Sequence, residues 1–108
     1  TRGDAIEAAT TALDNLQDND LVASAVRTSL DWLATEHPGR AVEVRVPPYR
    51  AVQILGGTTH RRGTPPAVVE MSAQTWLELF TKKLTWTDAL SSGQVVASGE
   101  RSDLSELF

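Results

Sequence analysis

Residues 38–48 read Pro-Gly-Arg-Ala-Val-Glu-Val-Arg-Val-Pro-Pro, and the spacing of apolar residues changes within them. Before Pro38 the apolar side chains recur at the spacing of a helix. After it, three valines alternate with Glu43 and Arg45, which is typical of a strand with one buried face. Pro47 ends the strand, because proline has no N–H to give to a sheet. This stretch therefore predicts a chain that forms helices first and a sheet afterwards.

Two helices are predicted before this stretch. The first extends from Asp4 to about Leu16, because Asp4 is a good N-cap residue and Glu7 follows at capping-box spacing. The second extends from about Asp20 to Glu36, where valine and leucine recur at helical spacing. Both helices are amphipathic, so we expect each to bury one face.

After the stretch, we expect three more strands and three more helices. The strands are residues 50–55, 67–71 and 94–98. The helices follow Ser72, Thr85 and Ser102, each a favourable N-cap residue. The order α-α-β-β-β-α-α-β-α is typical of an α+β domain in which helices cover a sheet.

The composition predicts one soluble domain. The chain has 108 residues, of which 41% are hydrophobic, enough for a single modest core. Cysteine is absent, which excludes disulfides and thiolate chemistry. The two histidines have no partner at metal-binding spacing, so neither a metal nor another cofactor is predicted. No apolar run exceeds three residues, so we expect no stable membrane insertion and a cytoplasmic location.

The net charge of −4 hides a basic segment. Between Pro38 and Pro66 five arginines face one glutamate, a local charge of +4, whereas both flanks are acidic. Acidic flanks argue against nucleic-acid binding, which needs a broad basic face. His60 and Arg62, with Arg45, are predicted to hold an acidic head group through charge-assisted hydrogen bonds. The alternative is a solvated turn that Arg62 braces through backbone carbonyls.

The two helices after Ser72 concentrate large apolar side chains, with Trp76, Phe80 and Trp86 inside eleven residues. Such spacing is more common in a core than in a ligand wall. We nevertheless expect these helices to face the sheet and some of their side chains to border a pocket. The residues predicted to line that pocket are Val52, Ile54, Trp76, Phe80, Trp86 and Leu90.

From about residue 20 to residue 108 the chain resembles the sterol carrier protein family, in a bacterial single-domain branch. The segment 68–72 (Val-Val-Glu-Met-Ser) matches the family's strand and capped helix. Residues 89–99 match its Ala-x-x-x-Gly-x-Val-x-x-x-Gly pattern, and the Pro-Pro segments 42–48 and 60–66 match the bacterial branch. The resemblance implies a mainly antiparallel sheet of four to five strands, with helices packed on one face over a hydrophobic cavity.

The resemblance predicts a non-catalytic carrier or binding module for a lipid, a fatty acyl chain or a sterol. The expected partner is thus an apolar small molecule, including one with an acidic head group, while any protein partner is unknown. Two alternatives stay open. One is an accessory domain of a thiol-dependent isomerase-type enzyme, and the other is a ligand-free protein-interaction module. Residues 1–108 are expected to form one domain, with 1–19 as an N-terminal helix that either belongs to it or extends it.

Overall fold

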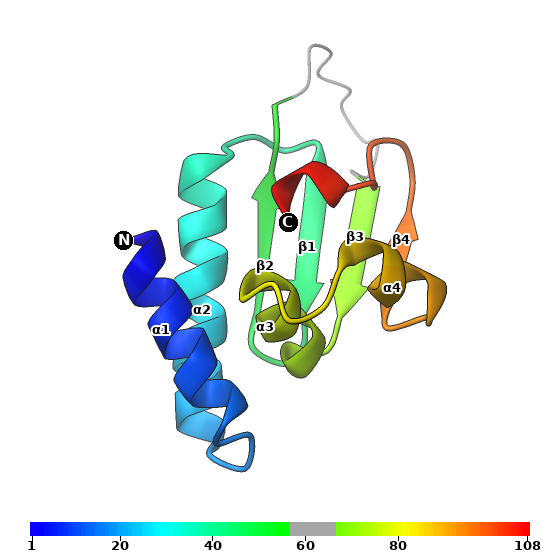
Figure 1. Ribbon diagram of the computed structural model, residues 1–108. Helices are drawn as coiled ribbons and strands as arrows, with labels where there is room; N and C mark the ends of the chain where they lie inside the picture. The colour runs from blue at the N-terminus through cyan, green and yellow to red at the C-terminus, as the bar shows by residue number, and fades with distance from the viewer. Residues whose placement is uncertain (57–66) are drawn as a thin grey trace.

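The computed structural model describes residues 1–56 and 67–108. Its elements follow the predicted order along the chain (Figure 1). They are α1 (Arg2–Leu13), α2 (Asn19–Glu36), β1 (Val42–Val46), β2 (Arg50–Ile54), β3 (Ala67–Met71), α3 (Ala73–Phe80), α4 (Trp86–Ser91), β4 (Val95–Ser98) and the 3-10 helix η1 (Ser105–Leu107). The predicted α+β class is confirmed, and the last predicted helix is a single 3-10 turn.

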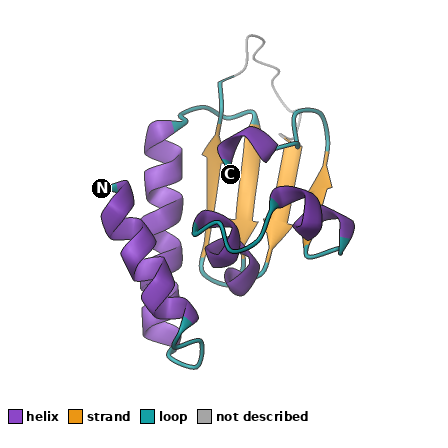
Figure 2. Cartoon of the chain, viewed as in Figure 1, coloured by secondary structure: helices purple, strands orange, loops and turns teal. Residues whose placement is uncertain are grey.

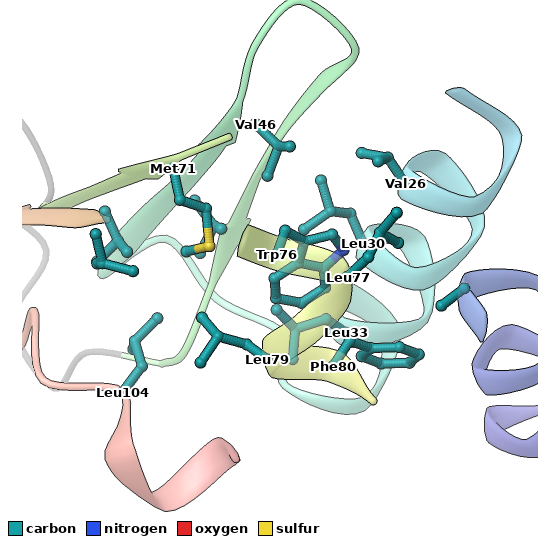
Figure 3. Packing of buried hydrophobic residues seen from close by; sticks show 14 of the residues in the cluster. Val26, Leu30, Leu33, Val46, Met71, Trp76, Leu77, Leu79, Phe80 and Leu104 are labelled. Atoms are coloured by element: carbon teal, nitrogen blue, oxygen red, sulfur yellow. The ribbon is translucent and has the colours of Figure 1, made fainter. Parts of the chain in front are cut away.

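The first two helices lie side by side and run in opposite directions (Figure 2). The buried face of α1 consists of Ala5, Ala9 and Ala12, which have no exposed surface. Small side chains at helical spacing let two helix axes approach closely. The buried residues of α2 include larger side chains such as Val26 and Leu30, and Leu30 lies beside Trp76 in the core (Figure 3).

The starts of three helices test the N-cap residues that the sequence predicted. Ser72 caps α3, and its hydroxyl accepts the N–H of Thr75 at 3.2 Å. Thr85 caps α4 in the same way, by accepting the N–H of Asp88 at 3.1 Å. Both caps are as predicted. The prediction for Ser102 is wrong, because η1 begins after Leu104 without a side-chain cap.

The start of α1 also differs from the prediction. The N-cap residue is Thr1, whose hydroxyl accepts the N–H of Asp4 at 3.2 Å. Asp4 therefore stands in the first turn of the helix rather than before it. A capping box pairs the N-cap residue with an acidic residue three positions later. In the structure this pair is Thr1 and Asp4, whereas the sequence predicted Asp4 and Glu7.

The four described strands form one sheet in the order β2-β1-β3-β4. β1 pairs with β2 antiparallel, with Val44 opposite Val52, and β3 pairs with β4 antiparallel, with Met71 opposite Val95. The central pair, β1 with β3, is parallel. The sheet is therefore mixed, with two antiparallel pairings out of three, which agrees with the mainly antiparallel sheet expected.

The two faces of this sheet differ in character, because successive side chains of a strand point to opposite sides. The inner face, which the helices cover, carries Val42, Val44, Val46, Ile54, Val69, Met71 and Val95, all buried. The outer face carries Glu43, Arg45, Ala51, Gln53, Val68, Glu70, Val96 and Ser98, which are exposed or partly exposed. The described helices therefore lie on one side of the sheet, as predicted, with α1 packed on α2 and α3, and the core lies between the two layers (Figure 2).

An ion pair ties the helical layer to the edge of the sheet. Arg50 Nη2 of β2 lies 2.6 Å from Asp31 Oδ2 of α2, and both side chains are well exposed. An exposed pair of this kind contributes about 0–1 kcal/mol, so it fixes orientation more than it stabilises the fold. Among the described residues, no helix is both long and apolar enough to cross a membrane.

Candidate functional site

Five aromatic side chains from α2, α3, α4 and the C-terminal segment contact one another. We call them the aromatic cluster, and they are Trp32, Trp76, Phe80, Trp86 and Phe108. The ring centroid of Trp76 lies 5.5 Å from that of Phe80 and 5.7 Å from that of Phe108. Phe80 reaches Trp32 of α2 at 5.8 Å, and Phe108 stacks on Trp86 at 5.9 Å. All three tryptophans of the sequence belong to this cluster, so tryptophan fluorescence reports on it without a label.

Trp76 is the centre of the cluster and has no exposed surface. Its ring lies among Leu30, Leu77 and Val46 (Figure 3). The indole Nε1–H donates to the hydroxyl of Ser29 at 2.8 Å, and that hydroxyl donates to the carbonyl of Ala25 at 2.6 Å. Every buried side-chain polar atom in the described part of the chain has a partner. The core around Trp76 is thus well packed, and its polar side-chain atoms all have hydrogen-bond partners.

Ser29→Ala is expected to lower the free energy of unfolding by about 1–3 kcal/mol, because it leaves the buried indole N–H without an acceptor. Urea unfolding followed by circular dichroism measures the loss. The same substitution in a Trp76→Phe background removes no partner from an indole, so it should cost clearly less. An equal cost in the two backgrounds would show that the hydrogen bond does not contribute.

A narrow cleft enters the molecule beside the cluster, and we call it the aromatic cleft. Its lining residues are Arg2, Trp32, Leu33, Leu79, Phe80, Lys82, Leu107 and Phe108. They come from α1, α2, α3, the turn after α3 and the C-terminal segment. The cleft has a volume of about 10 Å³, which is room for one water molecule at most. Pockets for drug-sized ligands measure about 300–1,000 Å³, so the cleft as it stands is closed to a lipid.

A larger hollow lies elsewhere, between α1 and the start of α2. It measures about 350 Å³ and opens widely to solvent, with Asp4, Glu7, Thr11 and Ser24 among its lining residues. None of the residues predicted for the site lines it. Its acidic and hydroxyl side chains do not suit an apolar ligand, so we place the candidate site at the aromatic cluster and its cleft.

The structure brings part of the predicted site together. Trp76, Phe80 and Trp86 are buried; Phe80 contacts Trp76 directly, and Phe108 links Trp76 to Trp86. Ile54 is buried on the inner face of the sheet, and Val52, half-buried, lies on that same face. These five predicted residues therefore belong to the two layers that enclose the core. Leu90 differs from the prediction, because its side chain is 44% exposed.

The predicted cationic residues do not gather at the cluster. Arg45 lies on the outer face of the sheet, because Val44 and Val46 on either side of it point inward. Its guanidinium pairs with the carboxylate of Glu43 on the same face. Arg45 was predicted to help hold a head group at the mouth of a pocket beneath the helices, but it lies on the opposite face of the sheet. His60 and Arg62 lie outside the described residues.

Seven residues that line the cleft were not predicted for the site: four charged or aromatic residues, and the leucines Leu33, Leu79 and Leu107. Trp32 borders the cleft from α2, and Arg2 does so from the start of α1. Lys82 and Phe108 complete the opening from the turn after α3 and from the C-terminal segment. Among the charged and aromatic ones, Trp32 alone carried a local signal, since it stands next to Leu33 of the buried stripe of α2.

Two carboxylates near the ends of the chain are held in the ionised form. The hydrogen bond with the Thr1 side chain, followed by the charge of the α-amino group, lowers the pKa of Asp4. Hydrogen bonds from Ser105, the backbone N–H first, lower the pKa of Asp103. The described residues contain no group of three or more histidine or acidic side chains able to hold a metal ion.

A comparison with known protein families shows to which family the chain belongs. Residues 18–108 match the family model described as "Bacterial SCP ortholog". The chain belongs to this family. The resemblance to sterol carrier proteins predicted from the sequence is confirmed. The matched residues of this SCP-family protein include α2, the four described strands and most of the residues that line the aromatic cleft. Helix α1, with Arg2, precedes the matched residues.

No curated protein matches the sequence. Solved structures similar to this SCP-family chain include two proteins of Aedes aegypti. Sterol Carrier Protein 2 Like 2 has 16% sequence identity and a TM-score of 0.41, over 76% of this chain and 95% of its own. Sterol Carrier Protein-2 like-3 has 14% identity and a TM-score of 0.40, over 70% of this chain and 87% of its own.

Proposed function

We propose that this SCP-family protein is a non-catalytic carrier that binds an apolar small molecule such as a lipid, a fatty acyl chain or a sterol. The observation that carries the proposal is the family match over residues 18–108, which spans both layers that enclose the aromatic cluster. The cluster supplies apolar walls for such a molecule. Each methylene group that leaves water there contributes about 0.8 kcal/mol to binding.

Binding must open the aromatic cleft, because its volume of about 10 Å³ holds no acyl chain. Leu107 and Phe108 are the side chains best suited to move. Both are only half-buried, and both belong to the short segment around η1, whereas Leu33, Leu79 and Phe80 on the cleft floor are buried. We therefore propose that the ligand chain takes the place of Phe108 against Trp76 and Trp86.

Titration with decanoic acid is expected to change tryptophan fluorescence in a saturable way. A ligand that binds only the folded protein also raises its stability, by about 2.7 kcal/mol at a concentration one hundred times the dissociation constant. The melting temperature should therefore rise with ligand concentration. Native mass spectrometry of freshly purified protein is expected to show a bound apolar molecule.

The closed core favours a second candidate, a protein-interaction module without a small-molecule ligand. In the described part of the chain Trp76, Leu77 and Leu79 fill the space between the layers. Such a module would show no saturable fluorescence change and no shift in melting temperature with decanoic acid, decan-1-ol or a sterol. Those results together would reject the carrier proposal.

A further inference from the structure

Two positive charges stand at the opening of the aromatic cleft. Arg2 and Lys82 line it, and both are exposed. Neither forms an ion pair with any carboxylate of the described residues. The segment 57–66 contains no aspartate or glutamate, so it supplies no partner. Asp4, the acid nearest to Arg2 along α1, has its carboxylate 3.5 Å from the amino group of Thr1.

The polarity of the cleft changes steadily from its opening to its floor. Arg2 and Lys82 are exposed, Trp32 and Phe108 are half-buried, and the floor is buried and purely apolar. A molecule that suits this gradient has a negative head and an apolar tail. None of the described residues that line the cleft has an acidic side chain, which suits a negatively charged head group.

Arg2 is held in place by its surroundings. Its guanidinium carbon lies 5.8 Å from the centroid of the Trp32 ring, within the range of a cation–π contact. Helix α1, whose first turn it occupies, is anchored by three fully buried alanines. Because α1 precedes the residues that match the SCP family, this charge is a feature that the N-terminal helix adds to the family fold.

Lys82 occupies a position where glycine is the usual residue. The N–H of Lys82 donates to the carbonyl of Leu79 at 3.1 Å, and the N–H of Lys83 donates to that of Glu78 at 2.8 Å. These two bonds form a Schellman motif, which requires a left-handed residue after the helix. Lys82 has φ of 63°. The chain thus keeps a charged side chain where a glycine would be less strained.

We propose that Arg2 and Lys82 bind the carboxylate of a fatty acid whose chain enters the aromatic cleft. This inference rests on the proposed carrier function and specifies its ligand. A sterol or a fatty alcohol presents a neutral hydroxyl group, which gains little from two cations. A carboxylate accepts charge-assisted hydrogen bonds from both, and the tail follows the apolar gradient inward.

The test compares decanoic acid with decan-1-ol, which has the same chain and no charge. The variant Arg2→Gln/Lys82→Gly removes both charges, and Lys82→Gly also relieves the strained backbone position. The matched control, Arg27→Gln/Lys83→Gln, changes the net charge equally at exposed residues that do not line the cleft. Affinities are measured by tryptophan fluorescence, and melting temperatures are measured without ligand.

We expect the cleft variant to bind decanoic acid about ten-fold more weakly than the wild type, since each exposed charge contributes only modestly. Its affinity for decan-1-ol should be unchanged. Lys82→Gly alone should melt no lower than the wild type while it weakens acid binding about three-fold. That combination separates a head-group contact from a structural role.

Three results would overturn the inference. If the cleft variant loses affinity for acid and alcohol alike, or for neither, the two cations do not recognise the carboxylate, although the carrier proposal stands. If the control variant weakens acid binding as much as the cleft variant does, the effect is one of overall charge. If the wild type binds neither compound, this inference fails, and the carrier proposal fails as well only if a sterol does not bind either.

Discussion

Trp76→Ala is expected to lower the free energy of unfolding by about 3–5 kcal/mol, the usual cost of truncating a fully buried large aromatic side chain. The indole contacts Phe80 and Phe108 and donates a hydrogen bond to Ser29, so its loss leaves a void and disturbs two layers. A domain of this size has a total stability of about 5–15 kcal/mol. The loss is therefore a large fraction of the stability of the fold.

Urea unfolding measures this loss, and circular dichroism at low temperature reports whether the variant still folds. Leu90→Ala is the matched control, because Leu90 comes from the same pair of helices but is 44% exposed. Its cost should stay below about 1 kcal/mol. If Trp76→Ala cost no more than Leu90→Ala, Trp76 could not be the centre of the core.

Sequence reasoning worked best where one local pattern determines one local structure. The alternation of valines with Glu43 and Arg45 predicts both the strand β1 and its buried face, because side chains alternate along any strand. Ser72 and Thr85 predict the starts of α3 and α4, because an N-cap acts within a single turn. Such features need no knowledge of the rest of the chain.

The same alternation of side chains along β1 also predicts the correct orientation of Arg45. A residue between two inward-facing valines must point to the outer face, away from any cavity beneath the helices. The prediction placed Arg45 with His60 and Arg62 because all three belong to one basic segment. Strand geometry separates residues that are close in sequence, and here it overrides local charge.

Other features depend on contacts that no local pattern encodes. Thr1 with Asp4 and Asp4 with Glu7 both have capping-box spacing, so sequence alone does not choose between them. Leu90 shares its helical spacing with Trp86, but α4 has only six residues and buries just Trp86 and Ala89. The parallel pairing of β1 with β3 follows from the path of the chain rather than from either strand's own residues.

The aromatic cleft is the clearest example of a feature that local patterns do not encode. The residues that line it come from both ends of the chain and from α2 and α3 between them. Arg2, Trp32, Lys82 and Phe108 are separated by dozens of residues. Each has an ordinary local environment, on a helix or in a turn. Only the tertiary packing of α1 and η1 against α2 and α3 makes them neighbours, so the candidate head-group site was out of reach of sequence reasoning.

Gly39→Ala is expected to destabilise the protein by roughly 3–5 kcal/mol, because it disrupts the junction between the end of α2 and the edge of the sheet. Gly39 has φ of 147°, a conformation that L side chains rarely adopt. A Cβ atom there would lie 1.8 Å from the carbonyl oxygen of Leu55. That peptide cannot move freely, since the Leu55 carbonyl accepts the N–H of Ala41 at 3.0 Å and the Leu55 N–H donates to His37 at 2.8 Å.

The matched control is Gly56→Ala, one residue beyond Leu55, where an added Cβ meets no atom of the described residues within 4 Å. That variant should stay within about 0.5 kcal/mol of the wild type. Urea unfolding of both variants measures the difference, and hydrogen exchange of the Ala41 amide tests its cause. The Ala41 amide should lose protection in Gly39→Ala alone, because the clash forces apart the two backbone segments that it joins. Equal stability of the two variants would show that the turn at Gly39 relaxes without breaking this junction.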